Sequence, residues 1–542
     1  MPTSTNPSPR SLSPSAHSDT FCRDNLPSPE DWPEIVLGPD TQYPDRLNCA
    51  TVLLDDVIRE RGGERPCLLS PAGEEWSYEE LRTTANRIAH LLVEDFGLVP
   101  GNRVLLRGPN NPWIVACWFA VLKAGGVVVS TMPLLRESEL AAVDEVARID
   151  LALCDHRFLD ELVAVGMSAP VLAYGGSEAG DLRQRVAGKS ADHDDVETAA
   201  DDVALLAFTS GTTGRPKATM HFHRDVLAVA DTFSRHVVQP TPEDRFTGTP
   251  PIAFTFGLGG AVIFPLRVGA STLLVEKATP AELAGHIDAH GATICFTAPT
   301  AYRALIAGGH AGSLRSVRRA VSAGEHLDEA TWRAFHEETG IRIIDGIGST
   351  ELLHVFVAAS DDDIHPGSTG IEVPGYTARI LDDDGTEVPD GTPGRLAVKG
   401  PTGCRYLADP RQQVYAENGW NITGDTYVRD AEGYFWYQAR NDDMIISSGY
   451  NIAGPEVEEA VVSHPDVADC AVVGHVDASR GQLVTAYVVV RDGVTAGPEL
   501  ASAIQDHVKS QIAPYKYPRR VEFLDELPRT ATGKLQRYRL RR

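Results

Sequence analysis

The chain has 542 residues, and 49 Lys and Arg against 75 Asp and Glu give it a net charge of −26 at neutral pH. This length is too great for one hydrophobic core and predicts at least two domains, while 42% hydrophobic and 23% charged residues are typical of a soluble globular protein. The acidic balance argues against binding to nucleic acid or to an anionic membrane, so an anionic ligand would need a local positive site.

The N-terminus is rich in Ser, Pro and Thr and lacks the apolar block of a signal peptide. We predict a disordered tail over residues 1–20. The eight cysteines are scattered without a Cys-x-x-Cys pair, which indicates reduced, mostly buried thiols in a cytoplasmic protein. The most apolar segment, residues 113–130, is interrupted by Lys123 and two glycines, so we predict a buried helix and a strand there, not a membrane span.

Strands and helices then alternate along the chain. Ser77, with Glu80 three residues later, predicts a capping box for a helix to about residue 94. A buried strand over residues 103–106 is followed by a helix over 112–123 and a strand over 127–130. This rhythm predicts parallel βαβ units in a layered α/β domain.

A hydroxyl- and glycine-rich loop, residues 208–217, separates two predicted strands. Gly211 and Gly214 allow the backbone to approach a ligand closely, and successive N–H groups in such a loop attract anions. With the charge of Lys217, the loop suits a polyphosphate. Its spacing does not match a Walker A loop, and an ordinary polar turn is the alternative.

Two later segments also place side chains where ligands bind in open α/β folds, beyond the carboxyl ends of strands. Residues 245–260 interleave aromatic residues with Gly and Pro and are predicted to be non-helical until about residue 258; ordinary core aromatics are the alternative. After a strand that starts at about residue 341, Thr350 and Glu351 suit a hard cation that bridges phosphates, or else begin a helix. His354 would follow one helical turn later, although a lone His is usually structural.

The chain after Pro455 predicts a compact α+β domain of common size. Its predicted elements are a helix over 456–464, strands over 469–474 and 483–490, and a helix over 498–511. Lys534 then lies in a Gly turn, where a solvated charge is the usual interpretation.

Residues 209–217, Thr-Ser-Gly-Thr-Thr-Gly-Arg-Pro-Lys, resemble the phosphate loop of the adenylate-forming superfamily, which includes acyl-CoA and aryl-CoA ligases, peptide-synthetase adenylation domains and luciferases. Partner motifs follow in the family's order: Gly-Ser-Thr-Glu at 348–351, Thr-Gly-Asp at 423–425 and Pro-Arg-Thr-x-x-Gly-Lys at 528–534. Residues 345–355 and the lead-in at 19–34 resemble the benzoate-CoA and 2-aminobenzoate-CoA ligase branch. Ile347 departs from the family's adenine-stacking Tyr, and Ala439 replaces a usual Gly.

The resemblance implies an α/β fold with a large N-terminal multi-layer α/β domain, residues 21–441. A hinge at Asp442 joins it to a small, mobile C-terminal α+β domain, residues 442–542. Rotation about this hinge is expected to separate two half-reactions.

The resemblance also implies site residues, with ATP, Mg²⁺ and coenzyme A as the small-molecule requirements. The catalytic set is Lys534, Lys217, Thr350 and Arg440, and Glu351 is the metal ligand. The remaining ATP-binding residues are Thr209, Ser210, Gly211, Thr212, Thr213, Gly214, Gly324, Glu325, Asp345, Gly346, Ile347 and Asp425. The aryl group is expected at Phe254, Thr255, Phe256, Gly257, Ala323, Gly348 and His354, and coenzyme A at Ser447, Ser448, Gly449 and Tyr450.

We predict an acid–thiol ligase that forms an aryl-adenylate and then an aryl-CoA thioester, with 2-aminobenzoate as the favoured acid. Benzoate or a hydroxybenzoate is the nearest alternative. An enzyme that loads a separate carrier protein and a catalytically silent nucleotide-binding protein are the alternatives from other classes. The partner is a small aromatic carboxylic acid, not nucleic acid or a membrane, and the protein is expected to be a monomer or a homodimer.

Overall fold

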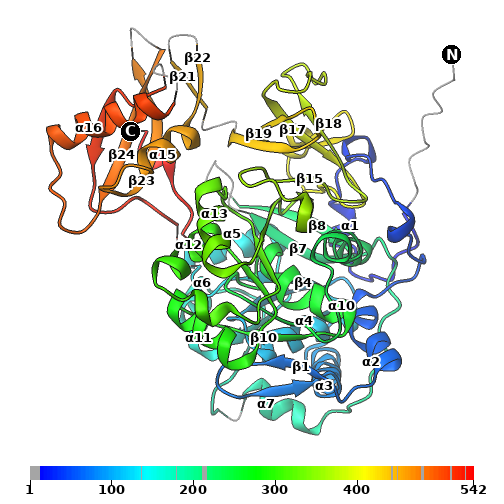
Figure 1. Cartoon of the computed structure of the whole chain (residues 1–542). Helices are drawn as coiled ribbons and strands as arrows, with labels where there is room; N and C mark the ends of the chain where they lie inside the picture. Colours follow the sequence, from blue (N-terminus) through cyan, green and yellow to red (C-terminus); the bar gives the residue numbers. More distant parts are fainter. Residues whose placement is uncertain are drawn as a thin grey trace. The chain divides into compact units, whose positions relative to one another are not determined.

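The structure is a computed structural model that describes residues 12–135, 137–178, 180–209, 216–440, 444–447, 450–477, 481–512, 516–530 and 533–541. The chain forms two compact units (Figure 1). The first comprises Met1–Ala378 and Val398–Asn421, and the second comprises Arg379–Ala397 and Ile422–Arg542.

Two sheets form the centre of the first unit. The six-stranded sheet has the order β6-β5-β3-β4-β7-β8 and is parallel except for the β7–β8 pair. Its strands are β3 (Arg103–Arg107), β4 (Val127–Thr131), β5 (Leu151–Asp155), β6 (Val171–Tyr174), β7 (Val203–Thr209) and β8 (Lys217–Phe222). Every residue of β3 and β5 is buried, as expected for parallel strands covered on both faces.

The nine-stranded sheet has the order β15-β14-β13-β12-β11-β9-β10-β1-β2. Its strands are β1 (Pro66–Leu69), β2 (Glu75–Ser77), β9 (Arg245–Gly248), β10 (Ser271–Leu274), β11 (Ile294–Thr297), β12 (Arg319–Ser322), β13 (Ile343–Gly348), β14 (Val355–Ala358) and β15 (Ile371–Glu372). Pairing is parallel from β1 to β13 and antiparallel at both ends. The carboxyl ends of its parallel strands therefore share one edge.

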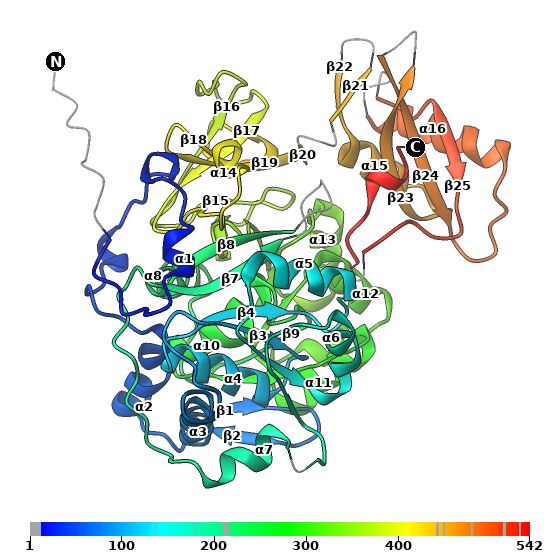
Figure 2. The same cartoon turned by 180° about the vertical axis from the view of Figure 1, so that it is seen from behind.

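Helices cover these sheets (Figures 1 and 2). The helices of the first unit are α1 (Phe21–Asp24), α2 (Asp56–Arg61), α3 (Tyr78–Phe96), α4 (Pro112–Lys123), α5 (Glu137–Ala147), α6 (Leu159–Val165), α7 (Leu182–Arg185), α8 (His223–Val229), α9 (Thr255–Leu258), α10 (Phe264–Val268), α11 (Pro280–His290), α12 (Pro299–Ala307), α13 (Glu329–Thr339) and α14 (Gln412–Tyr415). π-helical turns occupy Thr51–Asp55, Ala230–Val238 and Gly259–Ile263. Helices α11, α12 and α13 bury their apolar faces on β11, β12 and β13 in one hydrophobic cluster.

Two helix starts agree with the sequence. Ser77 and Glu80 form the predicted capping box at α3, and Asn111 caps α4 by accepting the N–H of Ile114 at 3.0 Å. Helix α4 is buried on nearly every side, which explains its almost wholly apolar sequence.

A further five-stranded sheet has the order β16-β17-β19-β18, with β20 paired to β19. Its strands are β16 (Thr377–Leu381), β17 (Gly394–Lys399), β18 (Ala416–Glu417), β19 (Trp420–Arg429) and β20 (Phe435–Arg440). The C-terminal sheet has the order β22-β21-β24-β23, with β25 parallel to β24. Its strands are β21 (Met444–Ser447), β22 (Tyr450–Ala453), β23 (Val467–Asp477), β24 (Gly481–Val490) and β25 (Arg520–Phe523).

Helices α15 (Gly454–Val462) and α16 (Pro498–Gln511) pack on the C-terminal sheet around a core that includes Val472 and Val488. The element order helix–strand–strand–helix matches the predicted α+β domain. The mixed α/β class predicted for the whole chain is confirmed.

The structure differs locally from several sequence predictions. Residues 1–11 of the predicted tail lie outside the described residues, but order begins earlier than residue 20, since Ser15 bonds to Asp202 at 2.5 Å and His17 is buried. The aromatic segment becomes helical at Thr255, three residues before the predicted start. Glu351 begins a turn and not a helix, because β13 passes directly into a bend.

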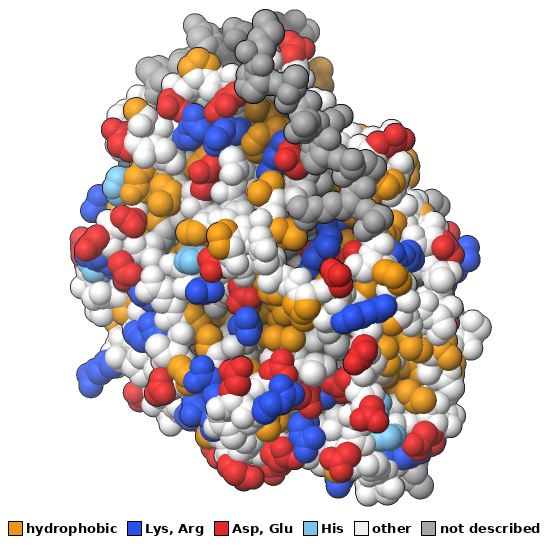
Figure 3. Space-filling view, turned by 90° about the vertical axis from the view of Figure 1, so that its right-hand side faces the viewer, with side chains coloured by type: hydrophobic (Ala, Val, Ile, Leu, Met, Phe, Trp, Pro, Cys, Tyr) orange, Lys and Arg blue, Asp and Glu red, His pale blue; other side chains and the backbone are white. Residues whose placement is uncertain are grey.

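The remaining predictions concern the cysteines, a membrane span and the charged surface. All eight cysteines are buried and none is in a disulfide. Within the described part of the chain, no helix is long and apolar enough to cross a membrane. On the face in Figure 3, acidic and basic side chains are interspersed among apolar ones.

Candidate functional site

Strand β8 brings Lys217 to Glu351. The Lys217 ammonium lies 2.9 Å from Glu351 Oε1 and also donates to the hydroxyl of Tyr406. Tyr406 donates to the same Glu351 oxygen at 2.5 Å. Lys217 also lies over the Tyr406 ring, 4.3 Å from its centroid, and 5.4 Å from that of Tyr415. The result is a compact group of one carboxylate, one ammonium and one phenol.

Alternate residues of β8 face this group, since side chains in a strand alternate between faces. His221, four residues after Lys217, pairs with the backbone carbonyl of Thr350 at 2.8 Å. A carbonyl only accepts, so His221 Nε2 carries the hydrogen. Burial lowers the pKa of His221 to about 4, which keeps the ring neutral at neutral pH. Strand β8 thus fixes both Lys217 and the turn that carries Glu351.

The turn after β13 has further fixed contacts. Thr402 Oγ1 donates to the carbonyl of Leu352 at 2.8 Å, and Ser349 Oγ accepts the N–H of Leu352 at 3.2 Å. The hydroxyls of Ser349 and Tyr415 lie 3.1 Å apart. Hydrogen bonds to the carbonyl of Thr350 and to the backbone of Leu352 therefore fix the chain on both sides of Glu351.

The charge state of Glu351 follows from these partners. Burial alone would raise the pKa of Glu351, which is only 6% exposed. The charge of Lys217 and the hydrogen bonds from Tyr406 and Lys217 outweigh burial and hold the pKa below its ordinary value. Glu351 is therefore an ionised, buried oxygen donor at neutral pH.

His354, predicted to line an aryl pocket, lies in a cluster of aromatic rings. Its ring centroid is 4.5 Å from that of Phe264 and 5.3 Å from that of the stacked Phe233. Phe256 at 5.7 Å and Phe296 at 6.5 Å complete the cluster. Burial lowers the pKa of His354 to about 3, and the nearby backbone of Phe256 opposes this only in part. His354 is thus a neutral aromatic side chain.

The neighbouring glycine permits this packing. A Cβ placed on Gly259 would meet the His354 ring at 2.4 Å, so only glycine allows the ring so close to α9. Leu353 has φ +69, which turns the chain between Glu351 and His354. The side chains of Glu351 and His354 consequently lie in different surroundings, the first among polar groups and the second among aromatic rings.

An apolar cavity shares Gly257 and Phe296 with this region. Its lining comprises Asn110, Thr247, Gly248, Pro250, Gly257, Gly260, Ala261, Leu273, Leu274, Val275 and Phe296. Gly248 ends β9 and Leu274 ends β10, so the cavity lies at the carboxyl edge of parallel strands. Cavities at this edge are common ligand sites in α/β folds.

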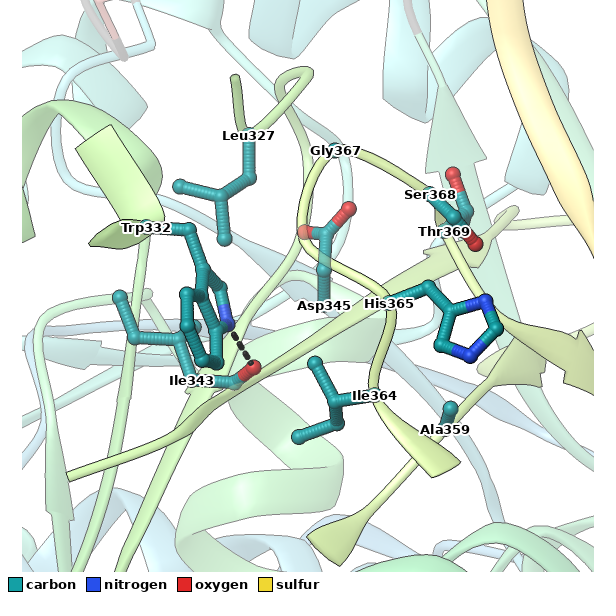
Figure 4. A pocket seen from close by; sticks show the side chains of 10 residues that line it. All are labelled: Leu327, Trp332, Ile343, Asp345, Ala359, Ile364, His365, Gly367, Ser368 and Thr369. Atoms are coloured by element: carbon teal, nitrogen blue, oxygen red, sulfur yellow. Dashed lines mark hydrogen bonds between the residues drawn. The ribbon is translucent and has the colours of Figure 1, made fainter. Parts of the chain in front are cut away.

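A second pocket contains Asp345 of β13 (Figure 4). Asp345 lies between Leu327 and Trp332 on one side and the loop carrying Gly367 and Ser368 on the other. Its Oδ1 is buried and has no hydrogen-bond partner among the described residues. Burial raises the pKa of Asp345 to about 8, so this carboxyl is mainly protonated at neutral pH.

The other predicted residues of the first unit lie near strand ends. Thr209 ends β7, and Ala323, Gly324 and Glu325 follow β12, where Gly324 has φ +87. Gly346, Ile347 and Gly348 belong to β13, and Phe254 and Thr255 begin α9. The structure thus places most of the described predicted residues of the first unit at strand ends of the two sheets.

Several predicted residues belong elsewhere. Ser210, Gly211, Thr212, Thr213, Gly214, Asp442, Ser448 and Gly449 lie outside the described residues. Asp425 of β19, Arg440 of β20, Ser447 of β21, Tyr450 of β22 and Lys534 are in the second unit.

The turn before Lys534 has its own fixed contacts in the second unit. Arg529 pairs with Asp469 at 2.7 Å and donates to the carbonyl of Gly533 at 2.7 Å. The Lys534 N–H donates to Thr530 Oγ1 at 3.0 Å. The backbone of Lys534 is therefore anchored, while its side chain is exposed.

Sequence reasoning missed Tyr406, Tyr415, Phe233, Phe264 and Phe296. Tyr406 follows Arg405 between β17 and α14, and no local pattern there signals a role. Aromatic residues in a core give no local signal of the ring that they will contact.

Known families and proteins match nearly the whole chain. Residues 54–406 match the family described as AMP-binding enzyme, and residues 456–534 match the AMP-binding enzyme C-terminal domain. The benzoate–CoA ligase of Thauera aromatica is 35% identical over 93% of this chain and 97% of its own length. A 3-hydroxybenzoate–CoA/4-hydroxybenzoate–CoA ligase of the same organism is 32% identical over 91% and 97%.

Among solved structures, the anthranilate CoA ligase AuaEII in complex with anthranoyl-AMP is similar with a TM-score of 0.87. It is 31% identical in sequence, and the match covers 93% of this chain and 98% of that chain.

Proposed function

This chain belongs to the AMP-binding enzyme family, and on that premise we propose that it is an ATP-dependent aryl-CoA ligase with 2-aminobenzoate as its favoured acid. The observation that carries the aryl assignment is the aromatic cluster of His354, Phe233, Phe256 and Phe264, next to an apolar cavity. Flat apolar walls with few polar groups suit a small aromatic ring.

The similar proteins act on related acids by their names: benzoate, hydroxybenzoates and anthranilate. We favour 2-aminobenzoate because residues 345–355 resemble that branch. Benzoate and hydroxybenzoate remain the alternatives for the same mechanism. We propose that Thr255 or His354 reads a ring substituent.

The proposed reaction has two steps. The carboxylate oxygen attacks the α-phosphorus of ATP, the bond to the bridging oxygen breaks, and pyrophosphate leaves. The thiol of coenzyme A then attacks the acyl carbon, loses its proton, and displaces AMP. Positioning and charge neutralisation are the enzyme's main contributions to the first step.

The residues take roles by this proposal. Lys217, Thr350, Arg440 and Lys534 contact phosphate or carboxylate oxygens during adenylation. The adenosine part contacts Asp345, Gly346, Ile347 and Asp425, with the ribose hydroxyls on Asp425. Thr209, Ser210, Gly211, Thr212, Thr213 and Gly214 hold the phosphates, and Gly324 and Glu325 contact the adenine. Ser447, Ser448, Gly449 and Tyr450 line the coenzyme A path after rotation about Asp442.

Glu351 fits the proposed Mg²⁺ site by its chemistry. It is an ionised oxygen donor, and Mg²⁺ commonly takes one or two carboxylates together with substrate phosphates. When bound, the ion would neutralise part of the phosphate charge. The lysine beside Glu351 supplies a positive charge at the same place before nucleotide binds.

The test is AMP release with ATP and Mg²⁺, with and without coenzyme A, across 2-aminobenzoate, benzoate, hydroxybenzoates, phenylacetate and a medium-chain fatty acid. We expect coenzyme-A-dependent release that is greatest with 2-aminobenzoate. A maximum with another benzoate would correct the acid and retain the mechanism. Activity on the fatty acid alone would contradict the aryl assignment.

A carrier-loading enzyme is the alternative for the acceptor. Pyrophosphate release without coenzyme-A-dependent turnover, restored by a phosphopantetheinyl carrier protein, would identify it. Detectable AMP formation of either kind would exclude a silent nucleotide-binding protein.

A further inference from the structure

Tyr406 is a fully buried side chain whose hydroxyl is directed at Glu351. Its backbone N–H donates to Gln412 Oε1 at 2.8 Å, and the Gln412 amide donates to the carbonyls of Asp31 and Cys404 at 2.8 and 3.1 Å. Gln412 is itself buried. The phenol is therefore fixed by its backbone as well as by its ring.

The segment that carries Tyr406 is paired with the strand that carries Lys217. Tyr406 bridges Thr219 in antiparallel fashion, and Leu407 N–H donates to the carbonyl of Ala218 at 2.9 Å. On the other side, Met220 N–H donates to the carbonyl of Arg405 at 2.8 Å. These hydrogen bonds set the register between the two segments. That register brings the Tyr406 hydroxyl and the Lys217 ammonium to the same oxygen of Glu351.

Arg405, the residue before Tyr406, forms a buried ion pair. Its guanidinium and the carboxylate of Asp225 are both fully buried and 2.8 Å apart. The guanidinium also lies 4.1 Å from the ring centroid of Phe222, the last residue of β8. Removing one partner of such a pair is costly, so the backbone next to Tyr406 is held firmly.

The two donors on Glu351 differ in charge. A divalent cation that approaches Glu351 is repelled by the Lys217 ammonium at close range. It meets no such repulsion from a neutral phenol. Lys217 also has a second anionic partner available, the nucleotide phosphates, whereas Tyr406 has none in its buried position.

We propose that Tyr406 is a positioning residue that keeps the Glu351 carboxylate oriented when Lys217 exchanges Glu351 for a nucleotide phosphate. The proposal rests on the proposed function for the nucleotide and the metal, and it adds the residue that prepares Glu351 for them. Lys217 is the exchanging partner of Glu351 and Tyr406 is the permanent one.

The test compares ATP binding by the full-length protein with and without Mg²⁺, measured by isothermal titration calorimetry. The quantity of interest is the gain in ATP affinity that Mg²⁺ produces. In Tyr406→Phe this gain should fall about tenfold or more, the scale of a lost hydrogen bond to a charged group. The affinity for ATP alone should not fall, since the hydrogen bond that Lys217 donates to the phenol is given up when Lys217 turns to a phosphate.

Tyr78→Phe is the matched control. Tyr78 is also fully buried, and its hydroxyl donates to the carbonyl of Ala270 at 2.6 Å, outside the turn that carries Glu351. Its loss should lower thermal stability to a similar degree and leave the Mg²⁺-dependent gain unchanged. An unchanged gain in Tyr406→Phe, or an equal loss in both variants, would overturn the proposal.

A double-mutant cycle gives an independent readout. In the Glu351→Gln background, Tyr406→Phe should cause no further loss of the Mg²⁺-dependent gain, because the carboxylate that it orients is gone. Additive losses would show that Tyr406 acts elsewhere. If Tyr406→Phe does not fold, 3-fluorotyrosine at position 406 replaces it. Its ¹⁹F shift must then change when Mg²⁺ is added to the ATP complex, and a constant shift would contradict the proposal.

These binding measurements need neither acid nor coenzyme A. A wild-type protein that binds Mg²⁺ and ATP as described but releases no AMP would contradict the proposed function alone. If Tyr406→Phe lowered AMP release but left the Mg²⁺-dependent gain in ATP affinity unchanged, the inference alone would be contradicted.

Discussion

At the residue scale, Asp345 shows how burial sets a charge state. One of its carboxylate oxygens is buried without a hydrogen-bond partner among the described residues, and burial raises its pKa to about 8. In an unfolded chain an Asp has a pKa of about 4. The folded protein therefore binds a proton that the unfolded chain releases between these two values.

This difference predicts a pH-dependent stability. The contribution of Asp345 to the free energy of unfolding is greatest below about pH 4 and is lost as the pH rises toward about 8, at up to about 1.4 kcal/mol per pH unit. Asp345→Asn cannot ionise and should flatten this dependence. Thermal unfolding at about pH 5.5 and about pH 7.5 checks it: the variant should gain stability relative to wild type at the higher pH. Parallel pH profiles for the two proteins would refute the assignment.

At the element scale, helix α3 depends on its first turn. Ser77 accepts the N–H of Glu80 at 3.1 Å, and Glu80 accepts the N–H of Ser77 at 2.7 Å. Together they satisfy N–H groups that would otherwise have no helical partner. The box is exposed and belongs to the joint between β2 and α3.

Ser77→Ala should therefore lower the free energy of unfolding by about 1 kcal/mol. Ser77→Asp retains an acceptor and places negative charge at a helix N-terminus, so it should keep most of the stability. Denaturant unfolding of the three proteins measures both effects. Equal losses for Ala and Asp would mean that the cap does not act through its acceptor.

At the scale of the whole molecule, the predicted site residues are divided between two units. Lys217, Glu351 and Tyr406 belong to the first unit, whereas Asp425, Arg440 and Lys534 belong to the second. The proposed function assigns Lys534 to adenylation only, since a rotation about Asp442 would withdraw it before the thiol attacks.

Lys534→Ala should thus lower aryl-adenylate formation by about a hundredfold or more, the scale of losing one charge-stabilising donor. Thiolation of a supplied aryl-adenylate by coenzyme A should stay near the wild-type rate. Single-turnover measurement of each half-reaction separates the two. Equal losses in both steps would contradict the rotation, and because the Lys534 side chain is exposed, we expect no loss of folding.

Local rules made much of this fold predictable from the sequence. Helix α4 begins after Asn111 and ends at Lys123, and α16 spans Pro498–Gln511, both as the sequence predicts. Capping, proline position and apolar patterning act over a few residues, so one segment contains all the information needed. The family motifs likewise identified Lys217 and Glu351 as candidates because each motif is contiguous.

Only the tertiary structure decided which of these segments meet. Tyr406 reaches Glu351 because its segment pairs with β8, and no local pattern records a contact between residues 55 positions apart. His354 enters an aromatic cluster because Leu353 adopts a left-handed conformation in the turn that follows Glu351, where a helix start is the alternative prediction. Burial then sets the charge states of Asp345 and His354, and the contacts from Lys217 and Tyr406 outweigh burial at Glu351. Desolvation and neighbouring charges depend on every element that surrounds a group and not on its neighbours in the chain.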